Sequence, residues 1–258
     1  MELNDRQRQL RERFIDKRGY WNPVWDSVLN TDPEFFEAYL ELSDVPWRKG
    51  LLEPKVKELI HVAIDASTTH LYLAGLREHV RNALRLGASK EELMEVLELT
   101  SVLGIHTCTE GMPILIEELA AAGQDPRSVE LNEEQKQLKA DFQRERGYWA
   151  YFWEGLLLLD PDFLKAYLQF SAVPWRKGAL EPKVKELIYA AIDAATTHLY
   201  LPGLHQHIAN AIGYGATKEE IMEMLELVTS LGMHTCWEGV PILMEELARA
   251  PMAGQTTA

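Results

Sequence analysis

The chain repeats itself at a fixed offset of 128 residues, and this duplication limits its fold more than any other feature. Residues 46–50, PWRKG, return as residues 174–178. From 46–118 to 174–246 the two copies align without a gap, and roughly 70% of the positions are identical. Each copy has the size of an ordinary domain, and so long a period argues against a short-repeat solenoid. We therefore expect two tandem domains related by pseudo-twofold symmetry.

The offset also predicts the domain boundaries. The first repeat covers residues 1–122 and the second covers residues 132–250. Residues 123–131 contain Gly123, Asp125 and Pro126 and form the expected linker. Residues 251–258 follow the last periodic segment and are expected to be a flexible tail.

The residue patterns predict helices and no strands. A helix starting at Pro54 has proline in its first turn, and its dense apolar positions indicate a buried central helix. Ser89 and Glu92 fit a capping box that starts another helix, as do Thr217 and Glu220 in the second copy. Because no alternating strand pattern occurs, we expect an all-α fold.

Composition excludes several classes of partner. The formal net charge of −14 opposes binding to nucleic acid, which needs clustered lysine and arginine. The N-terminus is polar, and no segment has the roughly 20 apolar residues of a membrane span. We expect a cytoplasmic protein that binds neither nucleic acid nor membrane.

Two cysteines, Cys108 and Cys236, occupy the same repeat position in the tripeptide His-Thr-Cys. This is unlike the cysteine-dense framework of a small secreted domain. Buried free thiols are the simplest interpretation. A disulfide between the two requires the pseudo-twofold axis to pass close by.

A repeated histidine pair is the main chemical signal. His70 and His79 lie nine residues apart, and both return in the second copy. On one unbroken helix nine steps of 100° place two side chains on opposite faces, so their convergence requires a break. Pro202 and Gly203 supply such a break. We place His70 at the end of the central helix or in the next turn, and His79 in the first turns of the following helix.

A third repeated histidine offers an alternative based on a metal ion. His106 follows the capped helix at another expected helix break, and Glu110 lies four residues further on. Three histidines, with the glutamate as fourth ligand or general base, suit zinc or another divalent ion. The alternative metal sets are His70, His79, His106 and Glu110 in the first repeat, and His198, His207, His234 and Glu238 in the second.

Two polar residues near the repeated histidines are replaced in the other copy. His61 becomes Tyr189, and Arg77 becomes His205. Neither residue can be required for chemistry that both copies perform identically, so we exclude them from the common site.

Several motifs together resemble a carboxymuconolactone decarboxylase domain. They are residues 57–60 (KELI), the helix break between His70 and His79 (the corner), residues 79–84 (HVRNAL), residues 87–92 (GASKEE) and the leucine-rich helix that follows. The resemblance covers roughly 50–118 and 178–246 and leaves the aromatic N-terminal part of each repeat outside.

The same superfamily contains thiol peroxidases similar to alkylhydroperoxidase D. Their motif is Cys-x-x-Cys with a histidine four residues after the second cysteine. Counting back from His79 gives Gly75 and Tyr72 at those positions. Because the thiol pair is absent, the disulfide cycle of these peroxidases cannot run there.

The decarboxylase branch implies roles for the repeated residues. Loss of carbon dioxide from an unsaturated lactone acid leaves a dienolate that a positioned acid must protonate, and histidine suits this task. His79 and His207 match the family's histidine and are the expected proton donors. Glu58 and Glu186 match its helix glutamate and are expected to orient or recharge the imidazole. The resemblance implies no cofactor.

Departures from the family pattern affect the expected substrate. The interval from Glu58 to His79 is about two residues longer than usual, and His70 and His198 have no firm counterpart, so we add them as catalytic candidates. We expect a carboxylated or carbonyl-bearing small molecule related to the family substrate. The candidate substrate-binding residues are Thr69, Thr197, Tyr72, Tyr200, Arg48, Arg176, His106 and His234, with the two arginines as carboxylate clamps.

Two further expectations concern assembly and a non-enzymatic role. Single-domain members of the superfamily form symmetric rings, so a tandem fusion needs half as many chains, and we expect a homotrimer. The non-enzymatic alternative is a helical scaffold that binds a small ligand or a partner without turnover. It predicts histidines that hydrogen-bond to backbone, whereas an enzyme needs their rings around a cavity.

Overall fold

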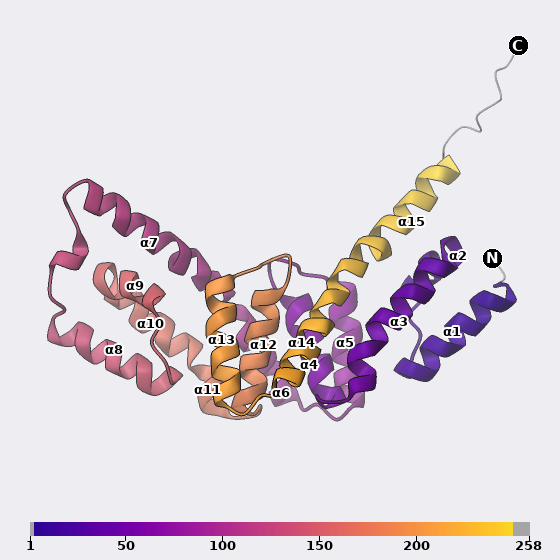
Figure 1. Cartoon of the computed structure of the whole chain (residues 1–258), viewed down its shortest axis with the longest axis horizontal. Helices are drawn as coiled ribbons and strands as arrows, with labels where there is room; N and C mark the ends of the chain where they lie inside the picture. Colours follow the sequence, from indigo (N-terminus) through magenta and orange to yellow (C-terminus); the bar gives the residue numbers. More distant parts are fainter. Residues whose placement is uncertain (1–2, 250–258) are drawn as a thin grey trace, which may run out of the picture. The chain divides into compact units, whose positions relative to one another are not determined.

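The computed structural model describes residues 3–249, which fold into helices without a strand (Figure 1). The first repeat contains α1 (Asp5–Arg18), α2 (Val24–Thr31), α3 (Pro33–Lys49), α4 (Pro54–Ala66), α5 (Leu73–Arg85), α6 (Lys90–Ser101), the 3₁₀ segment η1 (Val102–Ile105) and α7 (His106–Ala121). The second contains α8 (Glu133–Arg146), η3 (Tyr151–Trp153), α9 (Glu154–Leu159), α10 (Pro161–Ser171), α11 (Val173–Lys177), α12 (Pro182–Ala194), α13 (Leu201–Gly213), α14 (Lys218–Val228), η4 (Thr229–Met233) and α15 (His234–Arg249). The all-α, tandem prediction is confirmed.

The segment between α7 and α8 covers residues 122–132 and includes the predicted linker, residues 123–131. It contains a 3₁₀ turn, η2 (Pro126–Ser128), in which the Asp125 side chain accepts a hydrogen bond from the Arg127 N–H. The predicted tail at 251–258 lies outside the described residues.

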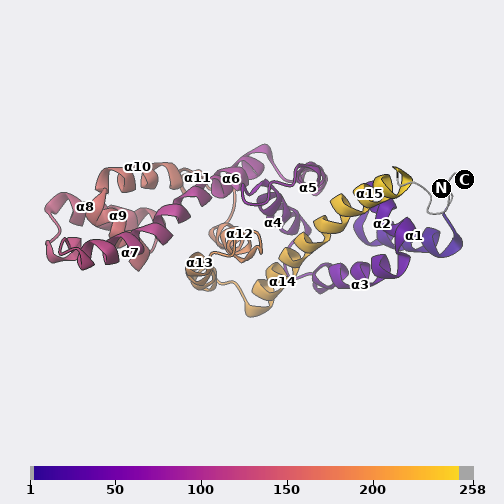
Figure 2. The same cartoon turned by 90° about the horizontal axis from the view of Figure 1, so that it is seen from above.

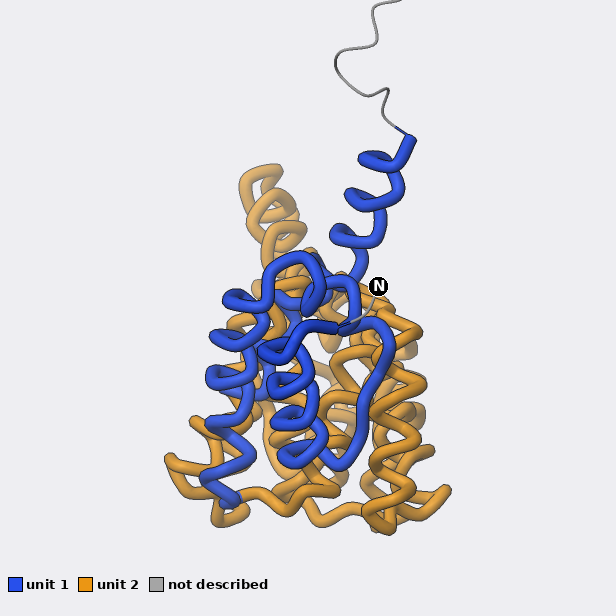
Figure 3. Tube along the Cα trace, turned by 90° about the vertical axis from the view of Figure 1, so that its right-hand side faces the viewer, with its two compact units in different colours: residues 1–51, 226–258 blue, residues 52–225 orange. Residues whose placement is uncertain are grey.

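The chain divides into two compact units that cross the repeat boundaries (Figure 3). Residues 1–51 and 226–258 make the smaller unit, and residues 52–225 make the larger one. In the larger unit α9, from the second repeat, packs against α7, from the first; in the smaller unit α2 packs against α15. The predicted divisions at 122 and 132 therefore follow the duplication in the sequence. We call the helices before each central helix the N-terminal arm of that repeat, α1–α3 in the first and α8–α11 in the second. Each arm packs with the last helix of the other repeat.

The centre of the larger unit is built on α4 and α12, the predicted central helices. They pack against each other, and each lies beside its partner helix, α5 or α13 (Figures 1 and 2). Every side chain of α4 from Val56 to Asp65 is buried. The capping box at Ser89 and Glu92, and its counterpart at Thr217 and Glu220, is formed as predicted.

Two buried ion pairs are exchanged between the repeats. Lys57 Nζ lies 2.7 Å from Glu223 Oε1, and Lys185 Nζ lies 2.6 Å from Glu95 Oε1. Each glutamate also accepts a backbone N–H, from Leu52 in one case and from Leu180 in the other. At the 128-residue offset Lys57 corresponds to Lys185, and Glu95 corresponds to Glu223. The two ion pairs are therefore related by the pseudo-twofold symmetry of the larger unit.

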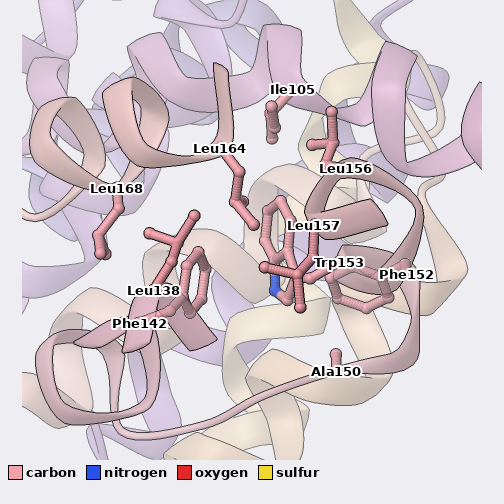
Figure 4. Close-up of a cluster of buried hydrophobic side chains, with 10 residues drawn as sticks. All are labelled: Ile105, Leu138, Phe142, Ala150, Phe152, Trp153, Leu156, Leu157, Leu164 and Leu168. Atoms are coloured by element: carbon pink, nitrogen blue, oxygen red, sulfur yellow. The ribbon is translucent and has the colours of Figure 1, made fainter. Parts of the chain in front are cut away.

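The second repeat's arm has its own core, shown in Figure 4. Phe142, Leu157 and Leu164 are fully buried there beside Trp153. Gly155 of α9 lies so close to Met112 of α7 that a Cβ at this position would overlap with the methionine side chain. The absence of a side chain at Gly155 therefore permits the close approach of these two helices.

The smaller unit holds the first repeat's arm. Phe14 and Phe36 are buried between α1, α2 and α3, and both rings contact Trp25. Trp25 also meets Trp237 of α15 in an edge-to-face contact, with ring centroids 4.5 Å apart. Aromatic packing of this kind accounts for the clustered tryptophans of the arm.

Both cysteines are free thiols, but they are half-buried rather than buried. Cys108 lies on the face of α7 that packs against the arm core, where the helix stays partly open to solvent. The thiols are free, as predicted, but the prediction that they are buried was wrong.

Within residues 3–249, no helix combines the length and the apolar character that crossing a bilayer requires.

Candidate functional site

The break between the paired histidines lies in the turns at 67–72 and 195–200. His70 and His198 lie in these turns, and His79 and His207 lie in the second turn of the next helix, as predicted. The break is made by Leu71 and Leu199, whose φ angles of 50° and 53° are in the left-handed region that non-glycine residues rarely adopt. The prediction that Pro202 and Gly203 make the break was wrong. They lie in the first turn of α13, where proline is well tolerated.

Each of these turns places a buried aspartate against the start of the next helix. The sequence patterns did not identify this aspartate as a site residue. The Asp193 backbone carbonyl accepts the Tyr200 N–H at 2.9 Å, and the Asp193 carboxylate lies against Gly203. A Cβ at Gly203 would overlap with Asp193 Oδ2. Asp65 and Gly75 repeat this arrangement. The sequence does carry a signal for this aspartate, because an acidic residue recurs in both copies of a helix that is dense in apolar side chains.

The structure brings together each expected glutamate–histidine pair. Glu186 Oε2 lies 2.6 Å from His207 Nδ1, and Glu58 Oε2 lies 2.6 Å from His79 Nδ1. In the second repeat the Asn210 side-chain amide also donates to Glu186 Oε1 at 3.2 Å. Burial lowers the pKa of His79, but the charge and hydrogen bond of Glu58 outweigh it, so the pKa is raised overall. The catalytic role of these pairs stays a prediction.

Asp193 lies among three imidazole rings. Its Oδ1 is 3.9 Å from both His106 Nδ1 and His198 Nε2, and its Oδ2 is 4.0 Å from His207 Nε2. Oδ2 has no hydrogen-bond partner in the described part of the chain. Burial raises the pKa of Asp193 to about 7, the charge of His207 opposes the rise and the charge of Glu186 adds to it. Burial likewise raises the pKa of Asp65 to about 7.

His106 comes from the first repeat but completes the site of the second. Its Nδ1 lies 2.6 Å from His198 Nε2, and its ring stacks on Tyr200 with centroids 3.8 Å apart. The Tyr200 hydroxyl donates a 2.6 Å hydrogen bond to Thr109 Oγ1. Burial, followed by the charges of His198 and His207, lowers the pKa of His106 to about 3, so its ring is neutral at physiological pH.

The position of His106 at the other repeat's site is inconsistent with the predicted metal sets, each of which took its ligands from a single repeat. His106 contacts His198 rather than joining His70 and His79, and Glu110 is exposed. In the larger unit, described side chains that could share an ion are His106 with Asp193 and His198, and Glu58 with His61 and His79. The rings of His61 and His79 stack nearly parallel, at 11° and 4.4 Å, so their nitrogen lone pairs do not converge.

The remaining metal candidates lie in the smaller unit. His234 is the first residue of α15, and its ring packs on Trp237 with centroids 4.6 Å apart. Glu238 is exposed.

The second-repeat site contains a small cavity. Its volume is about 20 Å³, room for about one water molecule. The wall combines charged, polar, aromatic and aliphatic side chains. Its polar and aromatic lining residues are His106, Thr109, Arg146, Tyr148, Phe152, Trp153, Tyr167, Tyr189, Asp193, Tyr200 and His207.

The predicted carboxylate clamps are surface residues. Arg48 Nε lies 3.1 Å from Asp44 Oδ2, and Arg176 Nη2 lies 3.0 Å from Glu145 Oε2, with both arginine side chains more than half exposed. The structure does not place Arg176 at the cavity.

The predicted threonines are also exposed. Thr69 Oγ1 lies 2.8 Å from Ser67 Oγ, and Thr197 is exposed as well. The threonine at the cavity is Thr109, which the sequence reasoning did not select.

A position excluded on sequence grounds lies beside the paired histidine in each repeat. His61 stacks on His79, and Tyr189 stacks on His207 with centroids 4.6 Å apart. His61 Nδ1 lies 3.0 Å from the Lys57 carbonyl oxygen. The two repeats therefore differ at a ring that touches the expected proton donor.

An all-α tandem repeat with a glutamate–histidine pair at each helical corner defines a recognisable class of protein. The profile of the carboxymuconolactone decarboxylase family matches residues 33–106 and 161–235. The chain therefore belongs to this family. It is also similar to a crystal structure from Burkholderia xenovorans LB400, provisionally named a gamma-carboxymuconolactone decarboxylase subunit. The two chains are 47% identical, with a TM-score of 0.91 over 95% of this chain and 98% of the other. No curated protein matches the sequence.

The family match begins earlier than the sequence resemblance. It starts at residues 33 and 161, the first residues of α3 and α10, whereas the resemblance started near 50 and 178. Part of the aromatic arm therefore belongs to the family domain. The earlier boundary was missed because the arm contributes packing residues such as Phe36 and Leu40, which carry no distinctive motif.

Proposed function

We propose that this protein is a decarboxylase-type lyase that acts by histidine and carboxylate acid–base chemistry on a small carboxylated or carbonyl-bearing substrate. One observation carries the proposal: His207 stands between Glu186 and Asp193 at the edge of a small cavity. Titratable groups with perturbed environments around a cavity are a usual sign of an active site.

The geometry supports a division of roles. The carboxylate of Glu186 accepts the His207 Nδ1–H, which leaves Nε2 directed toward Asp193 and the cavity. When the substrate's carboxylate C–C bond breaks, carbon dioxide leaves and its electron pair enters the conjugated system as a dienolate. The Nε2–H of protonated His207 then transfers its proton to carbon, and the imidazole becomes neutral.

Asp193 is a suitable source for the returning proton. Because burial raises its pKa to about 7, part of the Asp193 population carries a proton at neutral pH. Its Oδ2 lies 4.0 Å from His207 Nε2, which is within reach through one water molecule or a small side-chain movement. We assign the equivalent roles in the first repeat to Glu58, His79 and Asp65.

The two alternatives make different predictions. A non-catalytic scaffold predicts histidines that hydrogen-bond to backbone, but His79 and His207 bond to carboxylates, whereas His61 contacts a backbone carbonyl. A metal-dependent enzyme would use His106, Asp193 and His198, and the two histidine nitrogens would have to move apart from their direct 2.6 Å contact. Elemental analysis of the purified protein tests this second alternative.

The proposed function is tested by product analysis. The protein is incubated in D₂O with unsaturated lactone acids, including γ-carboxymuconolactone, the compound in the name of the Burkholderia relative. We expect release of carbon dioxide and one deuterium in each product molecule at the carbon that receives the proton. Carbon dioxide release without protein-dependent deuteration would contradict protonation by the site, and the absence of any turnover across the panel would contradict the lyase assignment.

A further inference from the structure

Arg146 is a buried cation at the end of the second arm. It is the last residue of α8, and only 4% of its surface is exposed. Arginine keeps its charge in proteins, so burying it is costly unless the charge is balanced.

The described chain provides little direct compensation for this charge. Arg146 Nη1 donates a 3.2 Å hydrogen bond to the Ser171 carbonyl, and the guanidinium lies 5.4 Å from the Trp175 ring centroid and 5.8 Å from that of Tyr189. The Arg146 Nε–H has no hydrogen-bond partner among residues 3–249, and no carboxylate in that range lies within 4 Å of the guanidinium.

The neighbouring carboxylates are committed elsewhere. Glu186 exerts a charge effect on Arg146, but its two oxygens are bonded to His207 and Asn210. Asp193 lies among the histidine nitrogens. Neither group serves Arg146 as a direct counter-ion.

The position of Arg146 gives this observation a function. Arg146 lines the same cavity as His207 and Asp193. The guanidinium and the expected proton donor therefore border one small cavity. A planar guanidinium with an unused N–H is a suitable partner for a carboxylate.

We infer that Arg146 binds a carboxylate group of the substrate and selects anionic over neutral substrates. The inference rests on the proposed function, because it assigns the substrate to the same cavity. It moves the clamp from Arg176, which is paired at the surface with Glu145, to a residue of the arm. The arm thereby determines which substrates the catalytic corner receives, while Glu186 and His207 supply the acid–base chemistry.

Binding requires the cavity to enlarge. At about 20 Å³ the space is smaller than a carboxylic acid.

The first arm contains the same local arrangement in the smaller unit. Arg18 Nη2 donates to the Ser43 carbonyl at 2.6 Å, and its guanidinium lies 4.8 Å from the Trp47 ring centroid. These residues are the counterparts of Arg146, Ser171 and Trp175 at the 128-residue offset.

The test follows the Arg146 Nε–H directly by NMR on the full-length protein. Crotonate is a small unsaturated carboxylate, and crotonamide is its neutral counterpart of the same shape. The Arg146 signal is assigned by its loss in Arg146→Lys, which retains the charge. We expect crotonate to shift this signal in a saturable manner and crotonamide to leave it unmoved, while the surface Arg176 signal serves as an internal control. An Arg146 signal that does not respond to crotonate, or responds equally to crotonamide, would overturn the inference.

Two variants separate this inference from the proposed function. His207→Gln is expected to abolish turnover at the second site and to retain the crotonate shift at Arg146. Arg146→Gln, measured with His79→Gln to silence the first site, is expected to raise KM for an anionic substrate at least tenfold, and Arg146→Lys is expected to recover part of the loss. If His207→Gln keeps full activity, the catalytic proposal fails while carboxylate binding at Arg146 still stands. If Arg146→Gln leaves KM unchanged, only the inference fails.

Discussion

The Nδ1 atom of His207 lies 2.6 Å from Oε2 of Glu186, and the same distance separates His79 from Glu58. A carboxylate at Nδ1 fixes the orientation of an imidazole ring and directs Nε2 to the opposite side. In the second repeat that side faces Asp193. The duplication has therefore preserved an oriented imidazole in both corners, although the ring stacked on it differs.

Loss of the orienting carboxylate should slow catalysis without unfolding the protein. Glu186→Gln, made together with His79→Gln so that only the second site acts, should lower kcat by about 10²-fold, within the usual range for acid–base groups. The neutral amide keeps the shape but no longer stabilises the imidazolium. Steady-state kinetics gives the readout, with exposed Glu219→Gln as control. An unchanged kcat would show that Glu186 does not support the histidine.

The raised pKa of Asp193 should appear in the pH dependence of stability. Burial raises this pKa from 3.8 to about 7. Between these values the folded protein holds a proton that the unfolded chain releases. The resulting stabilisation is fully present below pH 3.8 and is lost as pH rises through 7. Relative to Asp193→Asn, the unfolding free energy should fall across this range by up to about 4 kcal/mol.

Chemical denaturation of both proteins from acid to neutral pH measures this difference. His106 acts in the opposite direction, because burial lowers its pKa to about 3, but it is present in both proteins and cancels in the comparison. Exposed Asp162→Asn should follow wild type at every pH. Parallel pH profiles for wild type and Asp193→Asn would refute the shifted pKa.

A single methyl group at Gly203 should displace Asp193. The new Cβ would overlap with Asp193 Oδ2 and the Tyr200 ring, so Gly203→Ala should destabilise the fold by about 1–3 kcal/mol and reduce activity. Gly213, at the end of the same helix, faces open space, and Gly213→Ala should be neutral or stabilising by up to about 1 kcal/mol. Denaturant unfolding compares the two, and equal effects would contradict the described contact.

The buried ion pairs between the repeats should contribute more to the unfolding free energy than the exposed ion pairs near them. Lys185→Met leaves Glu95 buried without its cation and should cost about 3–5 kcal/mol. Lys177 pairs with Glu98 at a more exposed position, so Lys177→Met should cost at most about 1 kcal/mol. Thermal and denaturant unfolding measure both. A small cost for Lys185→Met would mean that Glu95 finds another partner or is hydrated.

We further predict that the chain assembles as a homotrimer. Exposed apolar side chains in the second halves of α7 and α15 offer surface for subunit contacts. They are Ile114, Leu115, Ile242, Leu243, Met244 and Leu247. Light scattering should give three times the chain mass of 29.4 kDa. A monomer over the whole concentration range would refute the assembly.

The sequence predicted the features that depend on local patterns. The central helix, the capping boxes and the location of His70 and His79 in a turn and a following helix each follow from spacing and helix chemistry within about 30 residues. The glutamate–histidine pairing was also expected, through resemblance to the family.

The missed features depend on contacts between distant segments. His106 lies 92 residues from His198, and nothing in either segment signals their contact. Arg146 ends an ordinary amphipathic helix, and only its burial and its missing counter-ion distinguish it from Arg176. Asp193 could have been selected, because an acidic residue inside a buried helix is costly unless it has a role.

The most direct test of the central claim is turnover by the double variant His79→Gln/His207→Gln. Decarboxylation of the substrate found in the D₂O panel is measured for wild type, each single variant, the double variant and the exposed control His205→Gln, two residues from His207. The account predicts that each single variant retains the activity of one site, that the double variant loses at least about 10²-fold, and that His205→Gln equals wild type. A folded double variant with wild-type turnover would contradict it.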